Sequence, residues 1–141
     1  MRKPFSYSFE IKGKDFLNAG NVSTEIKAML KELGIKPEII RRTAIACYEA
    51  EMNVVMYAQE AHVSLELSPK SIRIVFDDRG PGIPDIDLAM QEGYSTATPE
   101  MREMGFGAGM GLPNIKRNAD DFKVTSAVGK GVRLEILINI N

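Results

Sequence analysis

The sequence predicts an α+β domain, a two-layer α/β sandwich with a mostly antiparallel sheet and helices on one face. The first observation is the order of elements: a strand, two long helices, two strands, a glycine-rich segment, a helix and two final strands. The second is that neighbouring strand segments are joined by short turns, at residues 69–70 and 129–131, which implies antiparallel pairing. This combination is typical of α+β rather than doubly wound α/β folds. We expect a single domain over residues 1–141.

The first half of the chain is expected to form one strand and two helices. Apolar and polar residues alternate over residues 5–11, which predicts a strand with one buried face. Apolar residues at helical spacing predict a helix over residues 21–33, which Gly34 ends. Pro37 suits the first turn of a second helix, which is expected to end at about residue 59.

The second half is expected to contain four strands and two helices. The strands are predicted over residues 63–67, 72–76, 122–128 and 132–140, and the helices over residues 86–92 and from Leu112 onward. The connection over residues 78–109 has no clear periodicity, and connections of that length are usually functional.

Composition and charge exclude several classes of function. The chain has 18 Lys and Arg residues and 19 Asp and Glu residues, so its net charge of −1 does not favour direct binding to nucleic acid. No apolar stretch approaches the roughly 18–20 residues that a membrane span needs. The N-terminus lacks the apolar region of a signal peptide, and the single Cys47 cannot form an internal disulfide. We therefore expect a cytoplasmic globular protein.

Residues 105–111 have glycine at every second position, four of the 12 glycines in the chain. They lead directly into a helix start with Pro113 in its first turn. Exposed N–H groups at a helix N-terminus bind anions, and missing β-carbons let a polyphosphate approach. The dinucleotide pattern G-x-G-x-x-G does not fit, because Met110 stands where the third glycine is needed. A flexible linker is the alternative, but Phe106, Met110 and Leu112 are not typical of linkers, so the stretch favours a phosphate-binding loop.

A second glycine motif, D-x-G-x-G-I, follows the strand predicted over residues 72–76. Asp78 at the strand end could accept a hydrogen bond from an exocyclic amine, while the backbone at Gly80, Gly82 and Ile83 closes on a flat ring. The alternative is a simple tight turn.

The second predicted helix has Glu49 and Asn53 four residues apart, so both lie on one face. A carboxylate one turn before a carboxamide can act as a base beside a metal ligand, because Mg²⁺ prefers oxygen donors. The alternative is a solvated helix face. Glu51 points in another direction, and we assign it to such a solvated face.

In this order and spacing, the three motifs resemble the ATP-binding module shared by histidine kinases, type II topoisomerases, heat-shock chaperones and anti-sigma-factor serine kinases. This is the GHKL family, whose module is the Bergerat fold. Glu49-x-x-x-Asn53 resembles the N box of the family, Asp78-x-Gly80-x-Gly82 its first glycine box, and residues 105–112 its second. The resemblance covers nearly the whole chain and implies one ATP-binding kinase domain of this type.

The resemblance also implies roles for individual residues. Asp78 would hold adenine, Asn53 would bind Mg²⁺, and Glu49 would be the catalytic base. Residues 93–104 would form a mobile lid in which Arg102 reaches the γ-phosphate and Ser95 and Thr96 help closure. The residues expected to contact the nucleotide are Asn53, Asp78, Gly80, Gly82, Ile83, Arg102, Gly105, Gly107, Ala108, Gly109, Met110, Gly111 and Leu112.

Within the family, the chain is most similar to the anti-sigma-factor and switch kinases, whose switch-kinase members phosphorylate serine or threonine on small STAS-domain proteins. Residues 109–117 carry this similarity. A histidine kinase would need a further helix with a phosphoacceptor histidine, whereas the single His62 is expected to lie on the surface of a strand. Met56 stands where many histidine kinases have lysine, and Val132 stands where the family often has threonine, so one polar contact near adenine is expected to be missing.

Three functions follow as alternatives from the resemblance. The first is an ATP- and Mg²⁺-dependent serine/threonine protein kinase that acts on a STAS-domain partner, and the second is an ATP-dependent module that binds a sigma factor with little transfer. The third is a detached histidine-kinase-like ATPase domain. The presence of Glu49 favours chemistry over binding alone, and the resemblance suggests a homodimer.

Overall fold

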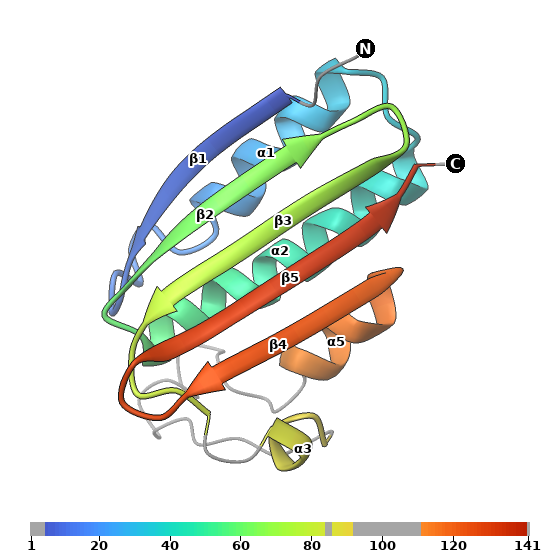
Figure 1. Ribbon diagram of the computed structural model, residues 1–141. Helices are drawn as coiled ribbons and strands as arrows, with labels where there is room; N and C mark the ends of the chain where they lie inside the picture. The colour runs from blue at the N-terminus through green and yellow to red at the C-terminus, as the bar shows by residue number, and fades with distance from the viewer. Residues whose placement is uncertain (1–4, 84–85, 92–110, 141) are drawn as a thin grey trace.

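A computed structural model describes residues 5–83, 86–91 and 111–140 of the chain. These residues form one five-stranded antiparallel sheet in the order β1-β2-β3-β5-β4, with the long helices behind one face (Figure 1). The strands are β1 (Phe5–Lys12), β2 (Glu60–Leu67), β3 (Ser71–Arg79), β4 (Asp121–Ala127) and β5 (Gly131–Asn139). The helices are α1 (Asn21–Glu32), α2 (Pro37–Tyr57), α3 (Ile86–Ala89) and α5 (Gly111–Asn118). The predicted α+β class, with helices on one face, is confirmed.

The boundaries of the elements differ from the predicted ones by a few residues. Helix α2 ends at Tyr57 rather than at residue 59, because Ala58 is extended and Gln59 donates its N–H to the carbonyl of Arg79 at 2.7 Å. Strand β2 accordingly begins at Glu60, where it pairs with both Lys12 and Arg79. Each of these shifts follows from pairing between distant segments, which the local pattern does not contain.

The core lies between the sheet and the helices. Leu65, Ile74 and Ile136 stand next to one another on three adjacent strands, and all three are fully buried. Helix α2 covers them with small side chains, including Ala46 and Ala50, which are also fully buried. Burial of each large aliphatic side chain is worth about 1.5–3 kcal/mol, so this layer fixes α2 on the sheet.

The other face of the sheet is polar. Arg73 donates to Glu135 at 2.6 Å, and His62 lies 2.5 Å from Glu10 on the neighbouring strand. The expected surface position of His62 is confirmed, because its side chain is half exposed. No helix in the described part of the chain has the length and apolar character to cross a membrane.

Glu51 is almost completely buried, with 1% of its surface exposed, so the assignment of this residue to a solvated face is wrong. Its carboxylate accepts hydrogen bonds from the N–H groups of Gly20 at 3.0 Å, Val22 at 3.2 Å and Ser23 at 2.9 Å. Helix α1 begins at Asn21 without a side-chain cap of its own. A carboxylate from α2 therefore takes the place of a cap, at the positive end of the helix dipole.

Replacement of Glu51 should destabilise the fold. Glu51→Ala removes a charged acceptor from three buried or half-buried N–H groups, so the free energy of unfolding should fall by about 3 kcal/mol. Urea denaturation measures this loss. Glu25→Ala on the exposed side of α1 is the control, with an expected change within about 0.5 kcal/mol. A similarly small change at position 51 would contradict the capping role.

Candidate functional site

Helix α2 presents Glu49 and Asn53 to the beginning of helix α5. A β-carbon at Gly111, the first residue of α5, would lie 3.3 Å from Oδ1 of Asn53 and 3.5 Å from Oε2 of Glu49. A side chain at this position would crowd the asparagine, so glycine allows the bare helix start to lie directly on the pair. The structure thus brings together the predicted base, the predicted metal ligand and the end of the predicted phosphate loop.

Glu49 is half-buried, and its surroundings act on its charge in two opposing ways. Burial raises the pKa of Glu49, and a side-chain hydrogen bond from Asn114 of α5 opposes that rise. The carboxylate is therefore a stronger base than an exposed glutamate while still being held by a donor. Such a group is suited to take a proton from a substrate hydroxyl.

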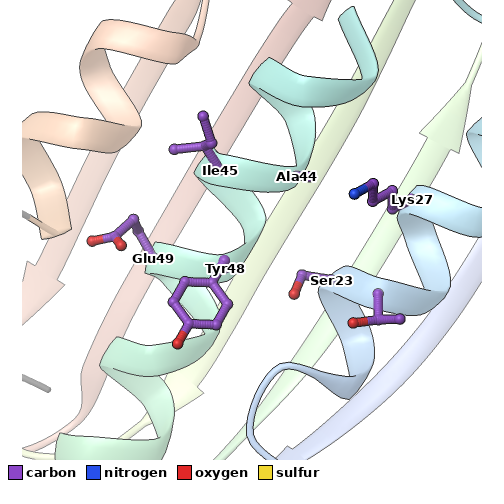
Figure 2. A pocket seen from close by; sticks show the side chains of 7 residues that line it. Ser23, Lys27, Ala44, Ile45, Tyr48 and Glu49 are labelled. Atoms are coloured by element: carbon purple, nitrogen blue, oxygen red, sulfur yellow. The ribbon is translucent and has the colours of Figure 1, made fainter. Parts of the chain in front are cut away.

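Glu49 also borders a shallow groove of about 320 Å³ between α1 and α2. Figure 2 shows Ser23 and Lys27 projecting from α1 on one side of Tyr48, with Glu49 on the other side. Tyr48 is 44% exposed, so an aromatic ring lies open between the cation and the carboxylate. The lining residues are Ser23, Thr24, Lys27, Ala44, Ile45, Tyr48 and Glu49.

Asp78 lies near the end of β3, half-buried and held by the neighbouring strand β5. Its Oδ1 accepts a hydrogen bond from the N–H of Val132 at 2.9 Å, whereas its other oxygen accepts none from the described residues. Burial raises the pKa of Asp78, the bond from Val132 lowers it, and the charge of Asp77 raises it further. One carboxylate oxygen is thus fixed by the protein and the second is left for a ligand.

Val132 contributes to this site through its backbone. The preceding Gly131 has φ of +143°, and a β-carbon there would lie only 2.1 Å from the carbonyl oxygen of Asp78. Only glycine permits so close an approach of β5 to β3. Val132 stands where the family often has threonine. Its backbone N–H still donates to Asp78, but its side chain has no hydroxyl to make a further polar contact.

The glycines after β3 are required by contacts with the protein itself. A β-carbon at Gly80 would lie 3.0 Å from Cα of Ala58, at the end of α2. Gly82 has φ of +79°, and a β-carbon there would lie 2.7 Å from the carbonyl oxygen of Ala127. The turn at Gly80 and Gly82 therefore packs closely against the end of α2 and against β4, which fixes the position of Asp78.

Ser126 on β4 belongs to this site, although sequence reasoning missed it. Its Oγ accepts a hydrogen bond from the N–H of Ile83 at 2.6 Å, which anchors the end of the turn. Ser126 stands opposite Val132 in the β4–β5 hairpin. In the sequence it is one polar residue of an alternating strand, so only its place beside the hairpin turn could have indicated a role.

The remaining predicted residues fall into two groups. Leu112 has its side chain buried in the core, so only its backbone is available to a ligand. Met56 is buried in a small cluster with Met52, and Phe16 packs against this cluster. Arg102, Gly105, Gly107, Ala108, Gly109, Met110, Ser95 and Thr96, with the expected lid at 93–104, lie outside the described residues.

Asn53 fits a magnesium ion that is bound mainly by phosphates. Within residues 5–83, 86–91 and 111–140, no cluster of three or more His, Cys, Asp or Glu side chains is arranged to hold a metal ion. Mg²⁺ in nucleotide sites usually takes one or two protein oxygens and completes its shell with substrate phosphates and water. The amide oxygen of Asn53, which faces the start of α5, is the kind of oxygen donor that such a site uses.

Comparison with known proteins agrees with this geometry. The family model of the histidine kinase-like ATPase domain matches residues 17–136, which is most of the chain. The chain belongs to the histidine kinase-like ATPase (GHKL) family. Its antiparallel sheet, with helices on one face, is the Bergerat fold of that family.

The relatives of this GHKL ATPase domain include a kinase and anti-sigma factors. The serine/threonine-protein kinase RsbT of Bacillus subtilis (strain 168) is 33% identical over 111 residues, which cover 76% of this chain and 77% of that protein. An anti-sigma F factor of Thermoanaerobacter sp. (strain X514) is 30% identical over 119 residues, covering 81% and 80%. An anti-sigma F factor of Clostridium kluyveri (strain NBRC 12016) is 29% identical over 122 residues, covering 83% and 82%. The chain is thus related to a kinase and to anti-sigma factors of its own size.

Removal of the charge at Asp78 should weaken ATP binding. Asp78→Asn loses a charge-assisted hydrogen bond of roughly 1.5–3 kcal/mol, which corresponds to about 10- to 150-fold in affinity. Asp77→Asn is a matched control, because Asp77 is exposed and pairs with Arg133 on the polar face of the sheet. Calorimetric titration with ATP compares the two variants. Equal affinities in two folded proteins would remove Asp78 from the site.

Loss of the Asn53 amide should act through the metal. Asn53→Ala is expected to weaken ATP binding more in the presence of Mg²⁺ than in its absence, because the missing group is an oxygen ligand. Calorimetric titration measures the ATP affinity of the wild type and of Asn53→Ala, once with Mg²⁺ and once with a chelator, and the loss of affinity is compared between the two conditions. If the affinity falls equally in both conditions, Asn53 supports the fold and does not bind the metal.

Proposed function

We propose that this GHKL domain is an ATP- and Mg²⁺-dependent serine/threonine protein kinase of the switch type, which phosphorylates a small STAS-domain partner. The observation that carries the proposal is the position of Glu49. Its carboxylate lies beside the start of α5, where phosphates would bind, and it also borders an open groove. An ATPase needs only water at this point, whereas an open groove suits a protein substrate.

The order of groups along α2 supports ATP as the cofactor. The turn that carries Asp78 packs on Ala58 at the end of the helix. Asn53 lies five residues earlier, and Glu49 a further turn back, so at 1.5 Å per residue the distance from Ala58 to Glu49 along the axis is about 13 Å. ATP presents its adenine, its metal-binding phosphates and its terminal phosphate in the same order.

Glu49 would accept the proton of the attacking serine or threonine hydroxyl. Phosphoryl transfer depends mainly on positioning and on neutralisation of charge, so the base adds to these effects rather than replacing them. Mg²⁺, when bound with ATP, would neutralise charge on the phosphates. Asn53 would hold that ion, and the N–H groups at the start of α5 would face the anionic groups.

The groove between α1 and α2 would give the acceptor segment its route to Glu49. Lys27 projects from α1, and the ring of Tyr48 is exposed between Lys27 and Glu49 (Figure 2). A cation and an open aromatic ring are suited to contact a protein surface. These residues would contact the partner protein and would not contact the nucleotide.

A second candidate function is supported by the anti-sigma F factors among the relatives. In this alternative, the domain binds a sigma factor when ATP is present and transfers little phosphate. Both functions use the same nucleotide site, and in both we propose a cytoplasmic homodimer on the basis of the family resemblance.

Glu49→Gln separates transfer from binding. The substitution keeps the size of the side chain and removes the base, so ATP affinity should stay within a few-fold, while transfer should fall by about 10²–10⁴-fold. The assay measures labelled phosphate transferred from ATP to a candidate STAS-domain partner. Glu38→Gln is the control, because Glu38 lies on the same helix in its exposed first turn.

The nature of the product distinguishes the candidates. Phosphate on serine or threonine survives acid, whereas phosphate on histidine does not, so an acid-labile product would contradict the proposal. If the wild-type protein modifies no partner but binds a sigma factor only with ATP, the binding module is the correct function.

A further inference from the structure

We infer that Asn114 is a positioning residue, which orients the Glu49 carboxylate for phosphoryl transfer by tying it to helix α5. The inference rests on the proposed function and adds a residue that the three sequence motifs do not include. Asn114 lies one turn beyond Gly111, the first residue of the same helix, where a β-carbon would lie 3.5 Å from Oε2 of Glu49.

The geometry of α5 directs Asn114 at Glu49. Residues three apart on a helix share a face, so Gly111 and Asn114 both face α2. A β-carbon at Gly111 would lie 3.5 Å from Oε2 of Glu49, and the side chain of Asn114 donates a hydrogen bond to the same carboxylate. The buried neighbours Leu112 and Ile115 anchor this turn in the core. Asn114 is therefore a half-buried polar residue in an otherwise packed contact between α5 and α2.

The C-terminal end of α5 is also bound to α2, which limits movement of Asn114 relative to Glu49. Nε of Arg42 donates to the carbonyl oxygen of Asn118 at 3.0 Å, and its Nη2 lies 3.1 Å from Asp120. The side-chain amide of Asn118 donates to the carbonyl of Asn114 at 2.8 Å within α5 itself, so this side chain is not part of the attachment to α2. Two attachments, one at each end, fix the distance between α5 and the base.

Glu49 needs such a tie because its side chain has three rotatable bonds and borders an open groove. A free glutamate would spread over several rotamers, and a base acts only within about 2.6–3.2 Å of the proton it takes. Helix α5 begins at Gly111, the last residue of the glycine-rich segment 105–111 that we expect to bind the triphosphate. The hydrogen bond from Asn114 therefore fixes the position of the Glu49 carboxylate relative to α5, the helix that is expected to face the phosphates.

The experiment compares Asn114 with Asn118, an asparagine one turn further along α5 whose side-chain amide donates to a backbone carbonyl of the same helix. Asn114→Ala and Asn114→Asp should each lower kcat for transfer by about 10-fold, with KM for ATP unchanged within about twofold. Asn118→Ala and Asn118→Asp should keep kcat near that of the wild type. Equal kcat values in the two series would overturn the inference.

A double-mutant cycle excludes a merely structural role. In a Glu49→Gln background, Asn114→Ala should cause no further loss of kcat, because the group that it positions is gone. A full additional 10-fold loss would show that Asn114 acts independently of Glu49 and would overturn the inference.

A spectroscopic readout needs no activity. The ¹³C signal of the Glu49 carboxyl, assigned by its disappearance in Glu49→Gln, should move in Asn114→Ala and stay in place in Asn118→Ala. If the wild-type protein transfers no phosphate but the signal moves in Asn114→Ala, the proposed function and the role of Asn114 in transfer are refuted. The contact between Asn114 and Glu49 would then still stand. Transfer by the wild type, with neither signal nor kcat changed in Asn114→Ala, would refute the inference alone.

Discussion

The buried carboxylate of Glu51 sets the position of the helix on which the site depends. It closes the N-terminus of α1 with three hydrogen bonds, and it lies on α2 two residues after Glu49. Because residues two apart on a helix point in different directions, Glu51 turned toward α1 leaves Glu49 and Asn53 facing α5. Ala46 and Ala50 complete the arrangement by packing α2 closely on the sheet. One helix thus meets three neighbours with three different faces.

The two halves of the site are joined by backbone contacts of glycines. On one side, Gly111 lets the start of α5 rest on Glu49 and Asn53. On the other, Gly80 packs on the end of α2, and Gly131 brings β5 against Asp78. Helix α2 lies between these contacts and takes part in both, which places the Asp78 carboxylate, the Asn53 amide and the Glu49 carboxylate in order along the helix. The glycines at positions 80, 111 and 131 are therefore needed for this spacing, because each allows a close backbone contact.

The sequence was sufficient to predict the fold class and the family, because these predictions depend on local periodicity and on short motif spacings. Glu49 and Asn53 share a face by helix geometry alone, and Asp78 lies near the end of a strand that is readily predicted. Sequence reasoning failed where a polar group serves a distant segment. Glu51 looks like any other helix-surface glutamate until α1 is packed on α2, and Ser126 looks like an ordinary strand residue until the turn at Ile83 meets it.

The central claim is that the described residues form one ATP site along α2. A crystal structure of the protein with Mg²⁺ and an ATP analogue that cannot transfer its terminal phosphate tests it most directly. The account predicts the exocyclic amine of adenine at the free oxygen of Asp78, the amide oxygen of Asn53 on Mg²⁺, and the terminal phosphate beside Glu49 at the start of α5. A nucleotide bound elsewhere, or bound with adenine away from Asp78, would contradict it.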